Sequence, residues 1–321
     1  MISAYVHEGN RFYKKTLEEL GEIPLESLAW IDLFRPTDTE AAMIRSTFGI
    51  ELPEKHEREE IESSSRYWED DRSIMINSYF FVSFFFADND TRPFNESVTF
   101  ILQDDILFTV RDKELHTFET VQQIITSRPK AFMSGYDILM QIFDVRIGAD
   151  ADLLEYAAKE SDEIRKKLLL DSSSHGIETL RRISLFQEFM LKVRQSVYDK
   201  RRILTALAKS PKVSESHKEE MFIMMKDVNS LVEFASVDMN TLDNLQNLFL
   251  AQISIEQNKI IKLFTVASVV LMPPTLVASI YGMNFRFMPE LGWSVGYPLS
   301  LALMFVAGSV PVLYFRKKGW L

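Results

Sequence analysis

The 321-residue sequence contains no cysteine. This excludes a disulfide framework, a thiol nucleophile and every zinc or iron–sulfur site built on thiolates. Histidine is scarce, and the five copies are scattered without an HExxH pattern or a paired helical spacing: His7, His56, His116, His175 and His217. A glycine-rich phosphate loop and a nucleophile elbow are also absent from the sequence. We therefore predict that the chain is not an enzyme, and we assign no catalytic residue and no catalytic cofactor.

Charge is missing from two long stretches near the C-terminus. Residues 263–285 and 291–315 contain no charged side chain, and each stretch exceeds the roughly 20 apolar residues that cross a bilayer. Residues 1–258, in contrast, carry 30 basic and 45 acidic side chains, a formal charge of −15. That acidic excess argues against nucleic-acid binding but not against metal cations. The pattern predicts an acidic soluble body followed by a membrane hairpin, and the alternative is a buried hairpin in a soluble core.

The residues around the hairpin predict its orientation. Lys259 and Lys262 precede the first stretch, and Arg316, Lys317 and Lys318 follow the second. The connector holds only one charge of each sign, and the N-terminus lacks the basic region and apolar core of a signal peptide. By the positive-inside rule, both termini of this multi-pass protein are expected in the cytoplasm.

The first 130 residues have the pattern of a mixed α/β domain. Thr37 followed by Glu40 predicts the capped start of a helix. The aromatic run at residues 80–86 lacks interleaved basic side chains, so it indicates a buried strand rather than a surface for stacking bases. The predicted elements are strands over 27–33, 74–87, 98–102 and 106–110, a turn at 103–105 and a charged helix over 51–65.

Glycine and proline are rare in the part of the chain that follows. Gly176 and Pro211 separate three predicted helices, which span 136–170, 177–209 and 214–281. Because the third segment has no glycine and almost no proline, it is expected to be one continuous helix about 100 Å long. Such a helix needs neighbours along its length, which favours a bundle or an oligomer around a shared axis.

Residues that are mostly small or polar recur along the end of this helix at steps of three and four. They are Asn258, Ile261, Thr265, Ser268, Met272, Thr275, Ser279 and Gly282. Heptad-like spacing places them on one face. In lipid, such a stripe is either a helix-packing seam or the wall of a water-filled pore, and spacing alone favours the seam. Since neither span carries an ionisable residue, we do not expect a proton relay or an acidic ion ring in the membrane.

The segment after the stripe carries a family resemblance. Tyr281-Gly282-Met283-Asn284-Phe285, followed by Phe287-Met288-Pro289-Glu290-Leu291, resembles the signature of the CorA magnesium channels. The basic segment from Tyr314 to Leu321 is similar to the tail of that family. Residues 255–262, 273–279 and, more loosely, 60–71 resemble its enterobacterial-type branch. A Gly-Met-Asn tripeptide at the end of the penultimate span, joined to Met-Pro-Glu-Leu, is a specific signal.

The resemblance implies a funnel-shaped homopentamer in the bacterial cytoplasmic (inner) membrane, in contact with lipid. It divides the chain into a cytosolic α/β domain (1–130), antiparallel cytosolic helices (131–212), a stalk helix (213–262), a pore-lining span (263–285), a periplasmic loop (286–292), a second span (293–315) and a basic cytosolic tail (316–321). With five copies around an axis, the stripe is expected to face inward, so that the residues from Asn258 to Ser279 line the pore.

The implied function is potential-driven Mg²⁺ influx, with Co²⁺ and Ni²⁺ as further permeant ions. Gly282, Met283 and Asn284 would form the selectivity filter, and a ring of Asn284 amides would bind the hydrated ion because Mg²⁺ dehydrates reluctantly. Glu290 in the outer loop either concentrates cations or serves packing. The family is also closed by cytosolic Mg²⁺ bound between subunits, for which the candidates are Asp227, Glu233 and Asp238; for each of them, a solvated helix face is the alternative.

Two competing functions remain open at this point. A zinc transporter of the same superfamily, coupled to protons, would also carry Gly-Met-Asn, although the Met-Pro-Glu-Leu sequence at residues 288–291 favours the magnesium branch. A membrane-tethered cytosolic enzyme or signalling domain would use the hairpin only as an anchor. Mutation of the Gly-Met-Asn segment separates these classes, because it would leave a tethered enzyme active.

Overall fold

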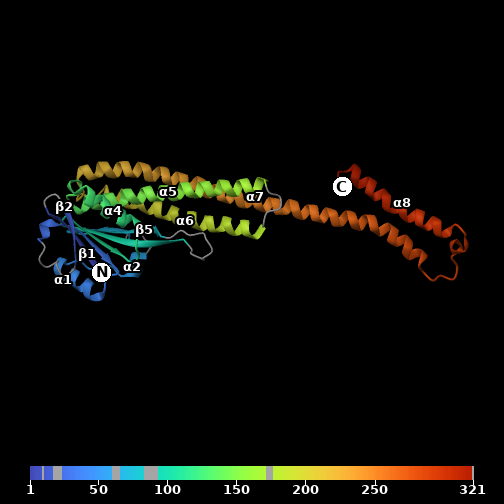
Figure 1. Ribbon diagram of the computed structural model, residues 1–321, viewed down its shortest axis with the longest axis horizontal. Coiled ribbons are helices and arrows are strands. Elements are labelled where there is room, and N and C mark those ends of the chain that lie inside the picture. Colours follow the sequence, from blue (N-terminus) through green and yellow to red (C-terminus); the bar gives the residue numbers. More distant parts are fainter. Residues whose placement is uncertain (9–10, 17–23, 60–65, 83–92, 171–175, 320–321) are drawn as a thin grey trace. The chain divides into compact units, whose positions relative to one another are not determined.

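The computed structural model describes residues 1–8, 11–16, 24–59, 66–82, 93–170 and 176–319 (Figure 1). The chain divides into two compact units, Met1–Gln246 and Asn247–Leu321. Helix α7 (Glu215–Tyr281) is continuous over 67 residues and contributes to both units. The expected single long helix at 214–281 is therefore confirmed.

A seven-stranded sheet organises the first unit. The strands are β1 (Ile2–Glu8), β2 (Arg11–Thr16), β3 (Leu28–Phe34), β4 (Tyr67–Glu69), β5 (Ser73–Val82), β6 (Phe94–Gln103) and β7 (Ile106–Arg111). Their order is β2-β1-β3-β7-β6-β5-β4. Neighbouring strands run antiparallel except β3 and β7, which pair in parallel. The predicted α/β character of this part is confirmed.

Different side chains cover the two faces of the sheet. One face carries an aliphatic core that includes Ile31, Leu33 and Ile101, against which Ile44 of helix α1 (Asp38–Phe48) packs. The other face is aromatic. The ring centroid of Phe100 lies 5.8 Å from that of Phe80, 6.5 Å from that of Phe118 and 5.7 Å from that of Phe143. Phe118 belongs to α4 (His116–Ser127) and Phe143 to α5 (Gly135–Leu170), so these helices are held to the sheet by ring contacts.

Long helices continue the first unit beyond the sheet. Helix α5 packs against α6 (Gly176–Leu207), and α6 also packs against β5. Figure 1 shows α5 and α6 running alongside the first part of α7. The α7 face that they cover is buried at Val228, Val232, Ala235, Leu242 and Leu245. From α6, Gln187 Nε2 donates to Asp243 Oδ1 and to Gln246 Oε1, both at 2.9 Å.

Local sequence signals in the first unit were accurate where turn chemistry was strong. Thr37 and Glu40 form a capping box, in which Glu40 N donates to Thr37 Oγ1 at 3.3 Å and Thr37 N donates to Glu40 Oε2 at 2.8 Å. The predicted turn at residues 103–105 joins β6 to β7, with positive φ angles of 50° at Asp104 and 63° at Asp105. Such angles suit a two-residue hairpin and are tolerated by aspartate.

The helix expected over residues 51–65 was wrong in extent. Among the described residues of that range, only α2 (Lys55–Glu59) is helical. Pro53 cannot donate to a helix, and the Glu57 side chain instead accepts from Glu54 N at 2.8 Å, which starts the helix one residue later. Residues 60–65 of that prediction, like residues 83–87 of the predicted strand over 74–87, lie outside the described residues.

The second unit contains the end of α7, a short 3₁₀ turn η4 (Pro289–Gly292) and α8 (Gly296–Lys317). Both long helices are long and apolar enough to span a membrane, and only 6% and 11% of their most apolar windows are buried within the chain. A core hairpin of a soluble protein would be mostly buried, so this exposure argues against that alternative. Helix α8 begins three residues after the expected start at 293, because Gly296 N closes a turn on Trp293 O at 3.1 Å.

Candidate ion pathway

Helix α8 approaches one face of α7 within the second unit. Val266 on that face is 6% exposed. A Cβ atom added to Gly308 of α8 would lie 3.2 Å from Pro274 Cγ and 3.5 Å from Val270 O. A glycine is therefore needed for the two helices to come this close, as is common for packing in lipid. Sequence reasoning missed Gly308, which lies between two other small residues, Ala307 and Ser309, in the second span.

The predicted pore-lining residues lie on a different face of α7. All seven are exposed in the single chain: Asn258, Ile261, Thr265, Ser268, Met272, Thr275 and Ser279. At 100° per residue, their mean direction lies roughly half a turn from that of Val266 and Val270. Within one chain, therefore, the seam between α7 and α8 is formed by other residues than the stripe. The stripe is left free for water, lipid or further copies of the chain.

The threonine hydroxyl groups of the stripe donate hydrogen bonds to the backbone of their own helix, so their oxygen atoms remain available as acceptors. Thr265 Oγ1 donates to Ile261 O at 2.8 Å, and Thr275 Oγ1 donates to Leu271 O at 2.7 Å. The hydroxyl protons are thus used within the helix, while the oxygen lone pairs remain available. A surface of uncharged acceptors suits the water shell of a cation, whose water molecules donate hydrogen bonds.

The Gly-Met-Asn segment lies directly after the last residue of α7. Gly282 N donates to Ala278 O at 2.9 Å, and Met283 N donates to Ile280 O at 3.2 Å. A Cβ on Gly282 would approach Ala278 O to 3.1 Å, so the glycine permits a close approach at the helix end. Asn284 is exposed, and its amide makes no hydrogen bond within the described part of the chain. A free neutral amide therefore follows the stripe of acceptors.

The outer loop is fixed through the backbone of Glu290. Its carbonyl accepts from Trp293 N at 3.3 Å, and a Cβ on Gly296 would collide with the same oxygen. The Glu290 residue is half-buried at the start of the 3₁₀ turn. These backbone contacts of Glu290 hold the loop in its conformation. Its side chain is the only acidic group of the connector, residues 286–292.

The three candidate regulatory residues are not brought together. Asp227 and Glu233 are exposed on α7, whereas Asp238 is 8% exposed. Eleven residues separate Asp227 from Asp238, which is about 16 Å along a helix. Within the described ranges, no group of three or more acidic or histidine side chains is arranged to hold a metal ion. A regulatory site that uses these residues would need ligands beyond those that the described ranges bring together.

Asp238 occupies a core position between α7 and its neighbours. It continues the spacing of buried residues that includes Ala235 and Leu242, and its Oδ2 atom is buried without a hydrogen-bond partner. Burial, and secondarily the negative charge of Asp162 on α5, raises the pKa of Asp238 to about 6. The heptad spacing of the buried residues was a signal for this position that the sequence reading did not use.

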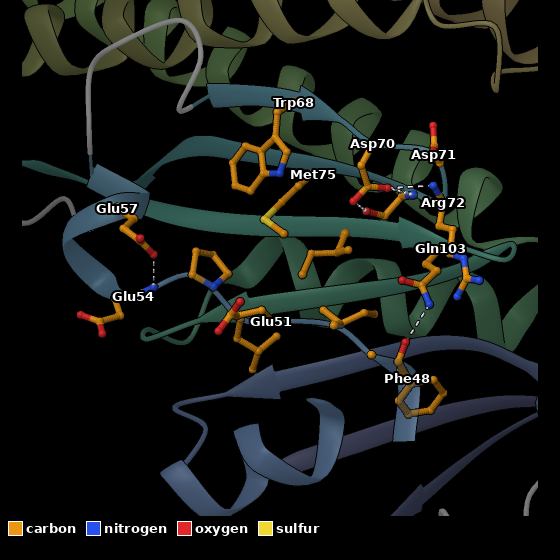
Figure 2. Close-up of a pocket in the computed structure, with 16 residues that line it drawn as sticks. Phe48, Glu51, Glu54, Glu57, Trp68, Asp70, Asp71, Arg72, Met75 and Gln103 are labelled. Atoms are coloured by element: carbon orange, nitrogen blue, oxygen red, sulfur yellow. Dashed lines mark hydrogen bonds between the residues drawn. The ribbon is translucent and has the colours of Figure 1, made fainter. Parts of the chain in front are cut away.

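A cavity lies on the aliphatic face of the sheet, away from the stripe, and has an acidic rim (Figure 2). Its rim includes Glu51, Glu54 and Asp71, while Met75 and Ile101 lie at its floor. The carboxylate of Asp70, at the same rim, stabilises a turn, because its Oδ1 accepts from Arg72 N at 2.8 Å and from Ser73 N at 2.6 Å. These hydrogen bonds lower the pKa of Asp70, which indicates a structural carboxylate.

Comparison with known proteins places this geometry in a family. A family model described as "CorA-like Mg2+ transporter protein" matches residues 26–317. The magnesium transport protein CorA of Wolinella succinogenes is 50% identical over 295 residues, 92% of each chain, and that of Escherichia coli K12 is 35% identical over 322 residues, all of both chains. The complete CorA structure from Methanocaldococcus jannaschii matches the fold with a TM-score of 0.82 at 21% identity, covering 100% of this chain and 99% of the other.

These matches extend through the acidic body, the long helix and both apolar helices, so they do not rest on the Gly-Met-Asn segment alone. The identity to the E. coli protein over the full length is well above what fold similarity alone would give. The chain is a member of the CorA-like Mg²⁺ transporter family.

Proposed function

We propose that this chain forms a Mg²⁺ channel in the bacterial cytoplasmic membrane and passes the hydrated ion along the α7 stripe to and from a ring of Asn284 amides. The observation that carries the proposal is that the stripe is exposed on the face of α7 opposite to α8 and continues to the free amide of Asn284. The names of the relatives at 35% to 50% identity support Mg²⁺ as the transported ion.

The chemistry of the filter follows from the reluctance of Mg²⁺ to lose water. Neutral amide oxygens of Asn284, with backbone carbonyls near Gly282, accept hydrogen bonds from the water shell without replacing it. Uncharged acceptors also release the ion readily, which conduction requires. Because such a filter reads a hydrated divalent ion, Co²⁺ and Ni²⁺ pass as well.

A homopentamer accounts for apolar side chains that a single chain leaves in water. Phe222, Phe234 and Val237 on α7 are 57%, 62% and 61% exposed, although they belong to the acidic unit. Contact with neighbouring copies would bury them and place five stripes around one axis. This assembly agrees with the expectation from the family. The basic residues that flank the two spans support a cytoplasmic position for both termini.

The membrane potential is sufficient to drive inward flux. It contributes about 2.3 kcal/mol per charge per 100 mV, and therefore roughly twice that for a divalent ion. Neither span carries an acidic, basic or histidine side chain, the usual groups of a proton relay. The proposed transport is consequently independent of the proton gradient, in contrast to the competing proton-coupled zinc transporter.

Cytosolic Mg²⁺ is proposed to close the channel by binding between subunits. The exposed carboxylates of Asp227 and Glu233 are accessible for such an ion, whereas Asp238 is enclosed by its own chain. A closed state that binds Mg²⁺ better than the open state gives feedback through differential affinity. Asp227→Lys should shift closure to a different Mg²⁺ concentration, and unchanged inhibition would remove this residue from the sensor.

Ion flux in proteoliposomes of the purified chain tests the proposal. Uptake of Mg²⁺, Zn²⁺ and Co²⁺ would be compared with and without a membrane potential and with and without a proton gradient. Potential-driven Mg²⁺ entry that ignores the proton gradient is expected. Proton-coupled Zn²⁺ movement with little Mg²⁺ flux would favour the competing transporter, and the lack of any flux would favour a tethered domain.

A further inference from the structure

A cationic cavity lies in the first unit, away from the ion pathway. It has a volume of about 800 Å³ and opens between β5 and the C-terminal half of α6. This size falls within the range of small-molecule sites. Four lining side chains are cationic, namely Arg66, Arg201, Arg202 and Lys209, and Asp199 is the single acidic one. Such an excess of positive charge is unexpected in a body with a formal charge of −15.

The buried guanidinium of Arg66 is only partly satisfied by the protein. Its side chain is only 1% exposed, and its Nη2 atom is buried without a hydrogen-bond partner. Nη1 makes only long hydrogen bonds of 3.4 Å to Arg58 O and Asn77 O, while the guanidinium lies 3.6 Å from the ring centroid of Tyr79. An unsatisfied buried donor is costly, so an acceptor in the cavity would recover that free energy.

Asp199 does not neutralise the cavity, because its carboxylate is committed to β5. Its Oδ2 accepts from Ser78 Oγ at 2.9 Å and from Tyr79 N at 2.8 Å, and its Oδ1 lies 4.0 Å from Arg66 Nε. Burial raises the pKa of Asp199, whereas Arg66, Lys200 and these hydrogen bonds oppose that shift. The cationic groups of the cavity therefore lack a carboxylate that is free to pair with all of them.

The other three cations lie on one side of α6 and just after it. Arg202 and Lys209 are exposed, and neither has an ion-pair partner among the residues that the structure describes. Arg202 lies in the last part of α6, and Lys209 lies in the turn that follows Leu207, the last residue of this helix. The Arg201 guanidinium lies 4.8 Å from the ring centroid of Tyr198. Several flexible cations beside a buried guanidinium suit an anion with several charges rather than one.

We propose that this cavity binds a phosphate-rich anion of the size of pyrophosphate or a nucleoside triphosphate. Arginine forks bind phosphate oxygens in pairs, and lysine adds a point charge. The cavity offers no uncommitted carboxylate to hold a metal ion together with the anion. It therefore prefers the metal-free anion, whose negative charge is greater than that of its Mg²⁺ complex.

Through this preference, occupancy of the cavity would depend on the concentration of the ion that the chain is proposed to transport. This link rests on the proposed function. When Mg²⁺ is scarce, more of the phosphate anion is metal-free, and occupancy of the cavity rises. The cavity would thus respond to the same ion as the acidic sites between subunits, but with the opposite sign. Binding itself does not depend on transport and is measured without it.

Isothermal titration calorimetry on the full-length chain in detergent tests the proposal. Pyrophosphate, ATP, inorganic phosphate and, as a non-specific control, sulfate would each be titrated with and without Mg²⁺. The variants Arg202→Gln and Lys209→Gln remove exposed charges without touching the core. Arg181→Gln is the matched control, because Arg181 is an exposed cation on the same helix outside the cavity.

Binding of pyrophosphate or ATP is expected to weaken about tenfold in each cavity variant, as for loss of one charged hydrogen bond, and to be unchanged in the control. Binding should also weaken when Mg²⁺ is added. Equal affinity for sulfate, equal loss in the Arg181→Gln control or no binding of any anion would overturn the site. Tighter binding with Mg²⁺ would overturn the preference for the metal-free anion. Because none of these measurements uses flux, they stand even where the channel proposal fails.

Discussion

The two units of the chain differ in how far their apolar side chains are exposed to solvent. The first unit encloses most of them between a sheet and its helices, and several of its buried charges are paired, as in the contacts of Arg111 with Asp32 and of Lys200 with Asp150. The second unit leaves side chains such as Leu263 and Phe305 66% and 77% exposed. The first unit thus carries its own solvent-excluded interior, whereas the second depends on lipid or further copies to cover it.

The largest expected effect would show that function depends on the second unit. Asn284→Ala removes the proposed filter amide, so Mg²⁺ flux in proteoliposomes should be lost while the oligomer still forms. Asn240→Ala is the control, because Asn240 is an exposed asparagine of α7 in the first unit. Normal flux in a folded Asn284→Ala protein would sink the filter assignment.

A buried ion pair offers the strongest test of the closed interior of the first unit. Arg111 Nη2 donates to Asp32 Oδ2 at 2.8 Å, and Thr109 Oγ1 donates to Asp32 Oδ1 at 2.8 Å. Asp32→Ala would leave the arginine unpaired and should lower the free energy of unfolding by about 3 to 5 kcal/mol. Chemical denaturation in detergent would measure this, with the exposed Asp38→Ala as control. Equal losses in both variants would contradict the closed interior.

The contact between α7 and α8 tests how closely the helices pack in the second unit. Gly308→Leu would press a side chain against Pro274 and should destabilise the second unit by about 1 to 3 kcal/mol. Gly148 of α5 is the matched control, because a Cβ there meets nothing within 4 Å. Gly148→Leu should be neutral or slightly stabilising, since glycine is a poor helix former. Thermal unfolding followed by circular dichroism would compare them, and an unchanged Gly308→Leu protein would rule out the close packing.

The smallest expected effect concerns Asp238, a buried carboxylate of the first unit whose Oδ2 atom has no hydrogen-bond partner. Because its pKa is raised to about 6 from an ordinary value of 3.8, it stabilises the fold below about pH 4, and this contribution is lost as the pH rises through about 6. Asp238→Asn should raise the stability at about pH 8 by roughly 1 to 2 kcal/mol and leave it unchanged near pH 4. Thermal melts without divalent cations would show this, and a pH-independent difference would refute it.

Sequence reasoning was most accurate where local chemistry decides the structure. The capping box at Thr37, the turn at residues 103–105 and the uninterrupted helix α7 all follow from residues close in the chain. The hairpin of β1 and β2 and helix α4 were not predicted, because their short patterns become decisive only when the sheet and the aromatic core assemble around them.

The residues of the candidate site could be predicted from the sequence, but the elements that pack around them could not. The stripe from Asn258 to Ser279 was found from spacing, yet only the position of α8 shows that the helix contact uses Val266 and Val270 instead. Likewise, Asp238 was expected to resemble Asp227, but tertiary packing separates a buried carboxylate from an exposed one. Sequence spacing reports which residues share a face and does not report what covers that face.

The uninterrupted course of α7 also restricts how this chain can change its length over evolution. Inserting one residue into the helix would rotate everything after it by about 100° and advance it by about 1.5 Å. Buried residues before the insertion, such as Val228 and Val232, would keep their contacts, while every later residue of α7 would face a new direction. Seven inserted residues would preserve the direction to within about 20°. Insertions and deletions are therefore expected to accumulate in the loops, whereas α7 lengthens or shortens by whole heptads.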